Sequence, residues 1–224
     1  MNISKDLQLN TSNLQILLYD ARKDGNNPGR RDSDLSRLLT AAALGRYLGH
    51  APSDEDLAGE LRLPGQKPCF PQYPDFHYNI SHSGGLIVCA VCDHPIGIDL
   101  QKIPEDPERA MKIASHFFSA KEQESLLALK RSRDLESLCL LFCRYWTARE
   151  SYIKLTGRGL GEPFDSYRPD LEAGLIRLAD PAEQNGSGRY YITECAAPDG
   201  FCMTVCCRVP LHSPEFEQYS FTLE

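Results

Sequence analysis

The amino-terminal third of the chain predicts one strand and two helices. The run Leu14–Tyr19 is short and almost continuously apolar, which predicts a buried strand. From Ser33–Leu48 apolar residues recur at helical spacing, and Gly49 follows as a terminator. The apolar face of this helix is Leu35, Leu38, Leu39 and Ala42. Ser53 with Asp56 three residues later predicts the cap of a shorter helix.

The middle of the chain predicts a β-hairpin that follows a polar corner. The apolar strand Leu86–Val91 leads through the turn Asp93–Pro95 into a second strand, Ile96–Gln101. The polar cluster Asn79–Gly85 runs directly into the first strand. We therefore expect the polar corner and the far end of the hairpin to be held at a fixed separation.

The second strand of this hairpin carries one acid, Asp99. Because side chains alternate across a strand, Asp99 shares a face with Gly97 and Gln101, opposite three apolar residues. Those three are Ile96, Ile98 and Leu100. Magnesium needs few protein ligands, since waters and substrate phosphates complete its shell, so one or two carboxylates suffice. On this strand alone, an acid that ends the strand or caps the next segment is the simpler interpretation.

Three helices and then a strand-rich region are predicted after the hairpin. A helix over Pro107–Phe117 is followed by a capping box at Ser119 and Glu122, and a long helix covers about Ser132–Gly157. The apolar side of the long helix is Leu135, Leu138, Cys139, Phe142 and Trp146. From Tyr167 the pattern indicates strands and turns.

The long helix also carries charged residues along one side. Trp146, Glu150 and Lys154 are spaced four apart and lie in line. A Glu–Lys pair at this spacing is by itself a common surface feature that stabilises a helix by only about 0.3–0.5 kcal/mol. Near a metal ion on Asp99, however, Glu150 would complete a carboxylate pair and Lys154 would neutralise a phosphate.

A short internal similarity indicates two related halves. The stretch "YNISHSGGLIVCAVC" from Tyr78 resembles "YITECAAPDGFCMTVCC" from Tyr191, at an offset of about half the chain. We predict an α+β fold with α/β-type halves, residues 1–103 and 104–224, related by a pseudo-two-fold axis. Each half is expected to be an antiparallel sheet packed with a long helix, with the active site in the cleft between them.

Composition excludes several classes of protein. The 224 residues carry a net charge of −7, which argues against a general nucleic-acid binder. No apolar run long enough for a membrane span and no secretory pattern are visible. Nine cysteines are an odd number, so reduced, buried thiols are expected rather than a disulfide framework. We expect a cytoplasmic monomer, and an anionic ligand would require a local basic patch.

The polar corner and the cysteines each allow a second interpretation. Ser81 and His82 could bind a phosphate beside the two glycines that follow, whereas adjacent residues in an extended segment diverge and are poorly placed as nucleophile and base. Cys89-x-x-Cys92 and Cys202-x-x-x-Cys206 could in principle form a four-thiolate zinc centre. Residues three apart on a strand face opposite sides, which disfavours zinc.

Three motifs together resemble those of one enzyme family. "NISHSGG", "IGIDLQ" and "YWTARESYIKLTGRGL" are similar, in order and separation, to the motifs of the Sfp-type phosphopantetheinyl transferases. The resemblance covers about Arg37–Ser166 and implies a pseudo-dimeric α/β fold with coenzyme A in the cleft. It further implies transfer of the phosphopantetheine arm of coenzyme A to a serine of an acyl or peptidyl carrier protein, which releases adenosine 3′,5′-bisphosphate.

The resemblance assigns roles to individual residues. Asp99 and Glu150 correspond to magnesium ligands, Glu150 is the candidate base, and Lys154 is the partner of the coenzyme A phosphates. Lys67, Ser81 and His82 correspond to coenzyme-contacting positions, and Arg37 corresponds to the basic contact near the adenosine 3′-phosphate. Arg30 and Arg31 would add to that basic patch, although their loop does not align cleanly. Gln101 stands in the third metal position, where many members have an acid, so we expect retained activity with a weaker or more metal-selective site.

The carrier protein and its pathway are less defined. The segment "QKIPEDPERAMKIASHFF" offers a basic and apolar dock for an acidic carrier, although an ordinary amphipathic helix explains it equally well. The candidate docking residues are Lys102, Arg109, Met111, Lys112 and Phe117. The full-length layout favours carriers of nonribosomal peptide or polyketide synthesis. Activation restricted to fatty-acid synthesis, and a non-catalytic coenzyme A- or carrier-binding module, stay open as alternatives.

Overall fold

The computed structural model describes residues 14–23, 32–63, 67–157, 163, 165–180, 188–211 and the backbone of 215–219. The strands are β1 (Gln15–Asp20), β2 (His77–Ser83), β3 (Leu86–Cys92), β4 (Ile96–Lys102), β5 (Tyr167–Asp170), β6 (Leu175–Leu178), β7 (Tyr190–Cys195), β8 (Phe201–Cys207) and β9 (Glu215–Tyr219). The helices are α1 (Asp32–Leu48), α2 (Asp54–Ala58), α3 (Pro107–Phe117), α4 (Ala120–Ser132) and α5 (Leu135–Thr156), with a 3-10 turn at Ala21–Lys23. None of the helices in these ranges is long and apolar enough to cross a membrane.

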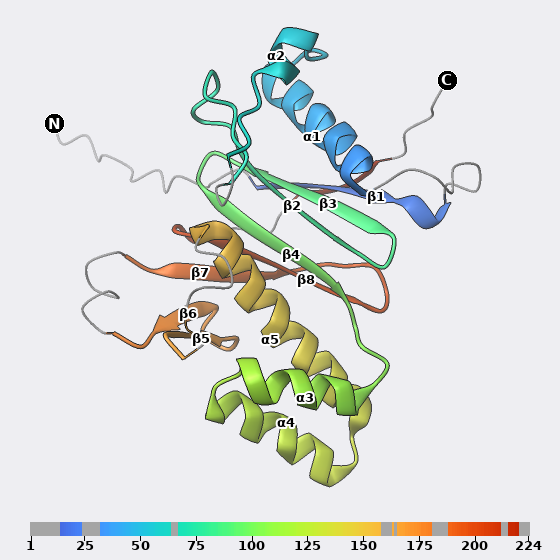
Figure 1. The fold of residues 1–224 in the computed structure, drawn as a ribbon, viewed down its shortest axis with the longest axis vertical. Coiled ribbons are helices and arrows are strands. Elements are labelled where there is room, and N and C mark those ends of the chain that lie inside the picture. Colours follow the sequence, from blue (N-terminus) through green and yellow to red (C-terminus); the bar gives the residue numbers. More distant parts are fainter. Residues whose placement is uncertain are drawn as a thin grey trace, which may run out of the picture.

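The strands form two sheets (Figure 1). The first has the order β2-β3-β1-β9, and the second has the order β4-β8-β7-β6-β5. All pairs in the second sheet are antiparallel. In the first sheet β9 runs parallel to β1, so the prediction of a wholly antiparallel sheet is wrong for this half. The prediction of a mixed α and β protein is confirmed.

A hydrophobic core lies between the two sheets, and a long helix covers the other face of each. Strands β1, β3, β4 and β8 contribute alternate side chains to the shared core, among them Ile16, Val88, Ile98, Leu100 and Val205. The opposite face of the first sheet packs on α1, and that of the second packs on α5 (Figure 1). Burial of each such side chain contributes about 1.5–3 kcal/mol, so this core joins the sheets firmly.

The helix ends follow the signals read from the sequence. Ser53 and Ser119 both form the predicted capping boxes, and Gly49 and Gly157 adopt positive φ angles of +76° and +69° directly after α1 and α5. The long helix α5 begins three residues later than predicted. Arg133 ends α4 in a left-handed conformation, and the side chain of Asp134 then caps α5.

The predicted hairpin between residues 86 and 101 is wrong. Strand β3 pairs with β2 and β1, whereas β4 pairs with β8 in the other sheet. The turn Asp93–Pro95 therefore carries the chain from one sheet to the other. The actual hairpin is β2–β3, which turns at Gly84 and Gly85 with φ angles of +55° and +81°. Most of the polar cluster Asn79–Gly85 belongs to strand β2. The sequence pattern did not predict this strand because it is rich in polar residues.

The two similar stretches of sequence are the two hairpins β2–β3 and β7–β8. In each case the second strand of the hairpin pairs with the strand that opens the unit, β3 with β1 and β8 with β4. The order strand, helix, hairpin therefore occurs twice along the chain. β4 precedes the proposed division at residue 103 yet belongs to the second sheet, and β9 belongs to the first.

Candidate functional site

Side chains of β2 join the edges of the two sheets. β2 and β4 are edge strands, and three side chains of β2 accept hydrogen bonds from amides of β4. The bonds run from Ile98 N to Asn79 Oδ1 (2.9 Å), from Leu100 N to Ser81 Oγ (3.1 Å) and from Lys102 N to Ser83 Oγ (3.0 Å). These bonds satisfy edge amides that the sheet leaves unpaired. They explain the Asn-x-Ser-x-Ser spacing of the motif.

Asp99 is buried beside this seam, with 2% of its surface exposed. Its Oδ1 accepts hydrogen bonds from Ser81 Oγ (2.8 Å) and Lys154 Nζ (2.7 Å), while Oδ2 has no hydrogen-bond partner within the described ranges. Burial raises the pKa of Asp99, and Lys154 and Ser81 oppose that shift. A buried carboxylate oxygen without a donor is costly, which indicates that a ligand completes this site.

Gly97 allows α5 to approach β4 closely enough to deliver Lys154. A Cβ atom at Gly97 would lie 2.0 Å from the carbonyl oxygen of Ser151 and 2.5 Å from the amide nitrogen of Leu155. Only a glycine fits here, because both of those atoms belong to the backbone of α5. The sequence placed Gly97 on the face of Asp99 but gave no indication of this close approach.

Glu150 supplies a second carboxylate one helical turn before Lys154. Its pKa is raised, first by burial and then by the negative charge of Asp99, and the charge of Lys154 acts in the opposite direction. Lys154 Nζ also donates to Ser81 Oγ (2.9 Å) and keeps 27% of its side chain exposed. Asp99 from one predicted motif is therefore brought together with Glu150 and Lys154 from another, although their chemical roles stay predictions.

The residues of this site are suited to a magnesium ion. Asp99 offers the unpartnered Oδ2, and Glu150 offers a second, partly desolvated carboxylate. Gln101 lies at the same seam, where its Oε1 accepts a hydrogen bond from Ser83 Oγ (3.2 Å). No group of three or more His, Cys, Asp or Glu side chains that could hold a metal occurs in the described ranges. Two hard oxygen ligands match magnesium, which takes water and phosphate for the rest of its shell.

Lys67 is near the carboxyl-terminal end of α5. Its Nζ donates to the carbonyl oxygen of Ile96 at the start of β4, and its stem lies beside Gly157. Burial lowers the pKa of Lys67 to about 8. Lys67 and Lys154, both predicted to contact coenzyme A, thus both bond β4, one at the backbone carbonyl of Ile96 and the other at the carboxylate of Asp99.

A basic hollow lies on the α1 side of β2. Arg37 and His82, both predicted to contact coenzyme A, line a cavity of about 370 Å³, and His82 Nδ1 is 3.3 Å from Asp32 Oδ2. Arg62 lines the same cavity and was not predicted from the sequence, because a single arginine in an irregular segment carries no pattern. The predicted contacts Arg30 and Arg31 lie outside the described residues.

Ser81 and His82 have separate roles, since they point to opposite sides of β2. Ser81 is 4% exposed, and its hydroxyl bonds Asp99, Lys154 and the amide of Leu100. His82 faces α1 and is more than half exposed. The geometry therefore agrees with the rejection of a serine–histidine catalytic pair. A coenzyme contact by Ser81 stays a prediction.

Arg149, the neighbour of Glu150, has a structural role that the motif did not reveal. It is 2% exposed and pairs with Glu122, with Nε to Oε1 at 3.1 Å and Nη2 to Oε2 at 2.6 Å. The rings of Phe118 and Tyr167 lie 5.4 and 5.1 Å from its guanidinium carbon. Glu122 is also the capping-box residue of α4, so this pair fixes α4 against α5.

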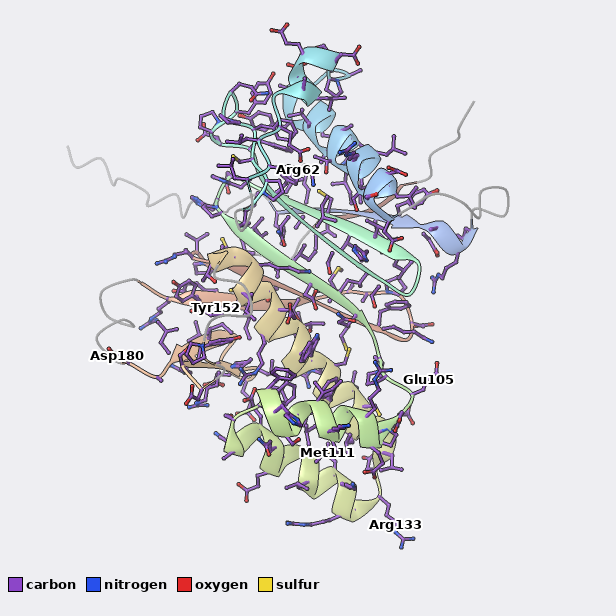
Figure 2. The ribbon with its side chains drawn as sticks, in the orientation of Figure 1. Arg62, Glu105, Met111, Arg133, Tyr152 and Asp180 are labelled. Carbon is purple, nitrogen blue, oxygen red and sulfur yellow. The ribbon has the colours of Figure 1, made fainter. Side chains whose placement is uncertain are left out.

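The predicted carrier dock is divided between exposed and packed residues. Met111 and Phe117 pack on the core formed by α3, α4 and α5, as an ordinary amphipathic helix requires. Lys102 pairs with Glu105 at 2.7 Å, Lys112 is exposed, and Arg109 lines a cavity of about 550 Å³ together with Gln101 and Trp146. Figure 2 labels Met111 on α3, at the end of the long axis opposite Arg62.

The cysteines considered for zinc lie in different hydrophobic clusters. Cys89 packs toward α1, Cys92 lies between the sheets, and Cys206 packs toward α5. All nine cysteines are free thiols. The packing role expected for most of them is therefore observed.

Comparison with known proteins places the chain in a family. The model of the 4'-phosphopantetheinyl transferase superfamily matches residues 95–206, half of the chain. The 4'-phosphopantetheinyl transferase Sfp of Bacillus subtilis is 37% identical over 145 residues, 64% of this chain and 60% of that protein. The 4'-phosphopantetheinyl transferase psf-1 of Bacillus pumilus is 34% identical over 189 residues, 82% of this chain and 76% of that protein.

A third relative extends the comparison beyond bacilli. The 4'-phosphopantetheinyl transferase HetI of Nostoc sp. is 33% identical over 177 residues, 78% of this chain and 69% of that protein. The match to the Bacillus subtilis protein Sfp, by contrast, covers less than two thirds of its length. The family match includes Asp99, Glu150 and Lys154, and the chain belongs to the 4'-phosphopantetheinyl transferase superfamily.

Proposed function

We propose that this protein transfers the 4'-phosphopantetheine arm of coenzyme A to a serine of an apo acyl or peptidyl carrier protein. Adenosine 3′,5′-bisphosphate would be the second product. The single observation that carries the proposal is the convergence of Asp99, Glu150 and Lys154 at the seam between β4 and α5, in a chain of this family. We further propose that the two strand–helix–hairpin units are related by a pseudo-two-fold axis, with the substrate site along their seam.

The basic residues along the seam suit the charges of coenzyme A. Arg37 and His82 line the hollow on the α1 side, which suits the adenosine portion. Lys67 and Lys154 both bond β4 and would neutralise the pyrophosphate. Because the whole chain is acidic, this local basic patch is what allows a polyanion to bind.

Glu150 is proposed to accept the proton of the carrier serine. The serine oxygen forms a bond to the phosphorus that bears the pantetheine arm, and the bond from that phosphorus to the bridging oxygen breaks. The raised pKa of Glu150 makes it a better proton acceptor than an ordinary carboxylate, provided that it is ionised before the reaction. Lys154 stabilises the charge that develops on the departing phosphate.

Asp99 and Glu150 would hold the magnesium ion, with Gln101 as a neutral third position. When bound, the ion supplies positive charge that offsets the charge of the pyrophosphate. Ser81 holds Asp99 and Lys154 in register by bonding both of them.

Replacement of Glu150 by Gln tests the proposal. With coenzyme A, magnesium and an apo carrier, the wild type should add the mass of phosphopantetheine to the carrier. Glu150→Gln should lower kcat by up to about 10⁴-fold, the upper range for loss of a general base, while folding changes little. Glu136→Gln, an exposed glutamate on the same helix, is the control and should keep full activity. Near-normal turnover of Glu150→Gln would overturn the role given to this residue.

The same assay separates the proposed alternatives. The two strand–helix–hairpin units favour carriers of nonribosomal peptide or polyketide synthesis, and a panel of such carriers beside a fatty-acid carrier tests that preference. Gln101, at a position where many family members have an acid, motivates the alternative of a non-catalytic binding module. Tight binding of coenzyme A without modification of any carrier would favour that module.

A further inference from the structure

Two cysteines from different sheets meet at one end of the shared core. Cys92 is the last residue of β3, and Cys207 is the last residue of β8. Because side chains alternate along a strand, Cys207 is on the same face of β8 as Met203 and Val205, which pack with Cys92 between the sheets. The two thiols hydrogen-bond one another. A pair of thiols therefore connects the two sheets.

The turn between β3 and β4 holds both sulfur atoms in place. Only a three-residue turn separates Cys92 from β4, and Cys207 is opposite the first residue of β4. Cys92 Sγ donates to Asp93 Oδ1 (3.3 Å), and Cys207 Sγ donates to the carbonyl oxygen of Pro95 (3.4 Å). Both sulfur atoms thus contact the same turn. Thiols within hydrogen-bonding distance can form a disulfide through small rotations of their side chains.

The surroundings of Cys207 favour a thiolate. The hydrogen bond from Cys92 lowers the pKa of Cys207, and burial opposes that shift. The next two backbone amides along the chain and the charge of His94 lower it further, and Lys67 also interacts electrostatically with Cys207. The pKa of Cys92 is raised by the same hydrogen bond and by burial. A thiolate beside a protonated thiol is the arrangement of a nucleophile and its resolving partner.

The thiol pair lies close to the surface although it is buried. Cys92 is 3% exposed and Cys207 is fully covered. The residues that follow Cys92 are open to solvent, since the side chains of Asp93 and His94 are 51% and 40% exposed. Such limited access suits a small, neutral oxidant such as hydrogen peroxide and disfavours a bulky one.

Two other cysteines of the same strands have a different environment. Cys89 of β3 packs toward α1, and Cys206 of β8 packs toward α5, so both face away from the core between the sheets. Burial raises the pKa of both thiols, which keeps them protonated. They are therefore matched controls for Cys92 and Cys207, with the same strands and the same residue type.

A second thiol pair, Cys143 and Cys202, lies between α5 and β8. At Cys202 the negative charge of Glu194 outweighs the positive charge of Arg144, so the nearby charges oppose a thiolate. This pair also belongs to the second sheet and its own helix. A disulfide between these two residues would not connect the sheets.

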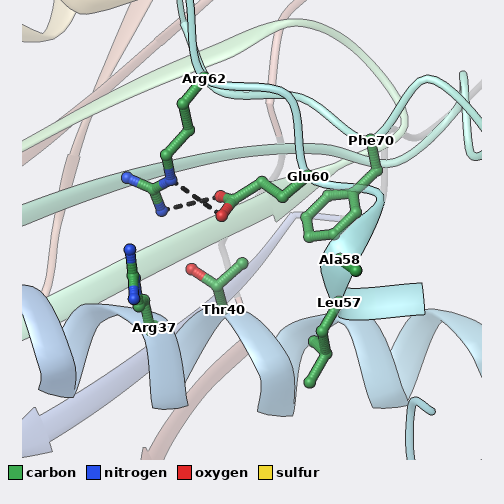
Figure 3. A pocket seen from close by; sticks show the side chains of 7 residues that line it. All are labelled: Arg37, Thr40, Leu57, Ala58, Glu60, Arg62 and Phe70. Atoms are coloured by element: carbon green, nitrogen blue, oxygen red, sulfur yellow. Dashed lines mark hydrogen bonds and ion pairs between the residues drawn. The ribbon is translucent and has the colours of Figure 1, made fainter. Parts of the chain in front are cut away.

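We propose that Cys92 and Cys207 are an oxidisable thiol pair whose disulfide joins the two sheets. Hydrogen peroxide oxidises the Cys207 thiolate to a sulfenic acid and releases hydroxide. The sulfur of Cys92 then attacks the sulfenic sulfur, and its proton leaves with the sulfenic hydroxyl as water. The site is separate from the basic cavity in Figure 3, which is lined by α1 and the segment after α2 on the other face of the first sheet.

Peptide mapping after oxidation tests the proposal. The reduced protein is treated with hydrogen peroxide, the remaining thiols are alkylated, and linked peptides are identified by mass spectrometry without reduction. A link between Cys92 and Cys207 should be the predominant one, and dithiothreitol should remove it. Cys89→Ala and Cys206→Ala should retain this link. The absence of any link, or a predominant link between other cysteines, would overturn the proposal.

Trapping with dimedone, which reacts with sulfenic acids, tests the roles of the two sulfur atoms. In Cys92→Ala the sulfenic acid at Cys207 has no resolving partner, so dimedone should label Cys207 more strongly than in the wild type. Cys92→Ser serves the same purpose if the alanine variant does not fold. In Cys207→Ala no label should appear on Cys92. Labelling of Cys92 there would overturn the role of Cys207 as the nucleophile.

The thermal midpoint measures whether the disulfide joins the sheets. Oxidation should raise the midpoint of the wild type by about 5–15 °C, because the link closes a long loop in the unfolded chain. Cys92→Ala should show no such rise, and Cys89→Ala should show it in full. An unchanged or lowered midpoint in the oxidised wild type would overturn the inference. None of these measurements requires coenzyme A or a carrier, so their results are independent of transfer activity.

Discussion

Two residues of helix α5, five positions apart, form ion pairs with buried acids. The two pairs differ in whether both carboxylate oxygens of the acid have hydrogen-bond partners. Arg149 pairs with Glu122, and the side chains are 2% and 3% exposed. Lys154 pairs with Asp99, and the side chains are 27% and 3% exposed. Arg149 forms a bidentate fork between two aromatic rings, whereas Lys154 bonds one oxygen of Asp99 and leaves the other without a partner in the described ranges.

The difference separates a structural pair from a functional one. A buried charge is tolerated when all its hydrogen bonds are made, as they are around Glu122, which also receives the amide and hydroxyl of Ser119. Asp99 has one carboxylate oxygen without a hydrogen-bond partner in the described ranges. Burial raises the pKa of Asp99 because the charged form is poorly solvated. Incomplete satisfaction at a buried acid is a cost in the free protein that a cation can relieve. The pair of Lys154 with Asp99 is therefore the one that can bind a cation and take part in the reaction.

Neutralising the two acids should have opposite consequences. Glu122→Gln leaves Arg149 buried without a counter-charge and should lower the free energy of unfolding by about 3–5 kcal/mol. Asp99→Asn keeps an acceptor for Ser81 and Lys154 and removes a poorly solvated charge, so stability should change by less than about 1 kcal/mol. Transfer activity should instead fall by about 10³-fold in Asp99→Asn.

Urea unfolding monitored by circular dichroism measures the first effect, and carrier modification measures the second. Activity per folded molecule of Glu122→Gln should stay within a few-fold of the wild type. Similar destabilisation by both substitutions would show that the two pairs are equivalent and would remove the distinction drawn between them.

The pH dependence of coenzyme A binding should test the role of Lys67 beside the Asp99–Lys154 pair. Burial lowers the pKa of Lys67 to about 8, so raising the pH above this value removes its charge and weakens its attraction for phosphate. From the fraction protonated, the KM for coenzyme A should rise about fivefold between pH 8 and pH 9. Lys67→Arg keeps its charge over this range and should not show that rise. An identical rise in both proteins would assign the titration to another group.

Gln101 offers the smallest and most specific change. Gln101→Glu adds a third carboxylate beside Asp99 and should lower the magnesium concentration for half-maximal activity by about tenfold or less. The kcat at saturating magnesium should change less than about threefold. If the magnesium requirement is unchanged, the side chain at position 101 does not contribute to the metal site.

Local signals predicted the helices accurately. Ser53, Ser119 and Gly157 act through hydrogen bonds and backbone angles within a few residues of themselves, so the sequence contains all the relevant information. The hairpin prediction failed for the complementary reason. Two strands joined by a short turn usually pair, but β4 finds its partner β8 about a hundred residues later, and no local pattern encodes that choice.

The candidate site was predicted in part. Asp99, Glu150 and Lys154 were identified because helical and strand periodicity place them on defined faces, and a family resemblance joined the faces. Arg62, and the use of Asn79, Ser81 and Ser83 as links between sheets, were not predicted. Each depends on a partner from a distant segment, and an arginine or serine in isolation is compatible with many environments.

The sequence by itself determined the helices, their caps, the strand faces and the motifs of the family. Those features follow from backbone geometry and side-chain chemistry over short separations. Only the tertiary structure decided that the edges of β2 and β4 meet, that Gly97 admits α5, and that Asp99 keeps one oxygen without a donor. These outcomes depend on how two sheets pack over a shared core, because the free energy of that packing is summed over residues far apart in the chain.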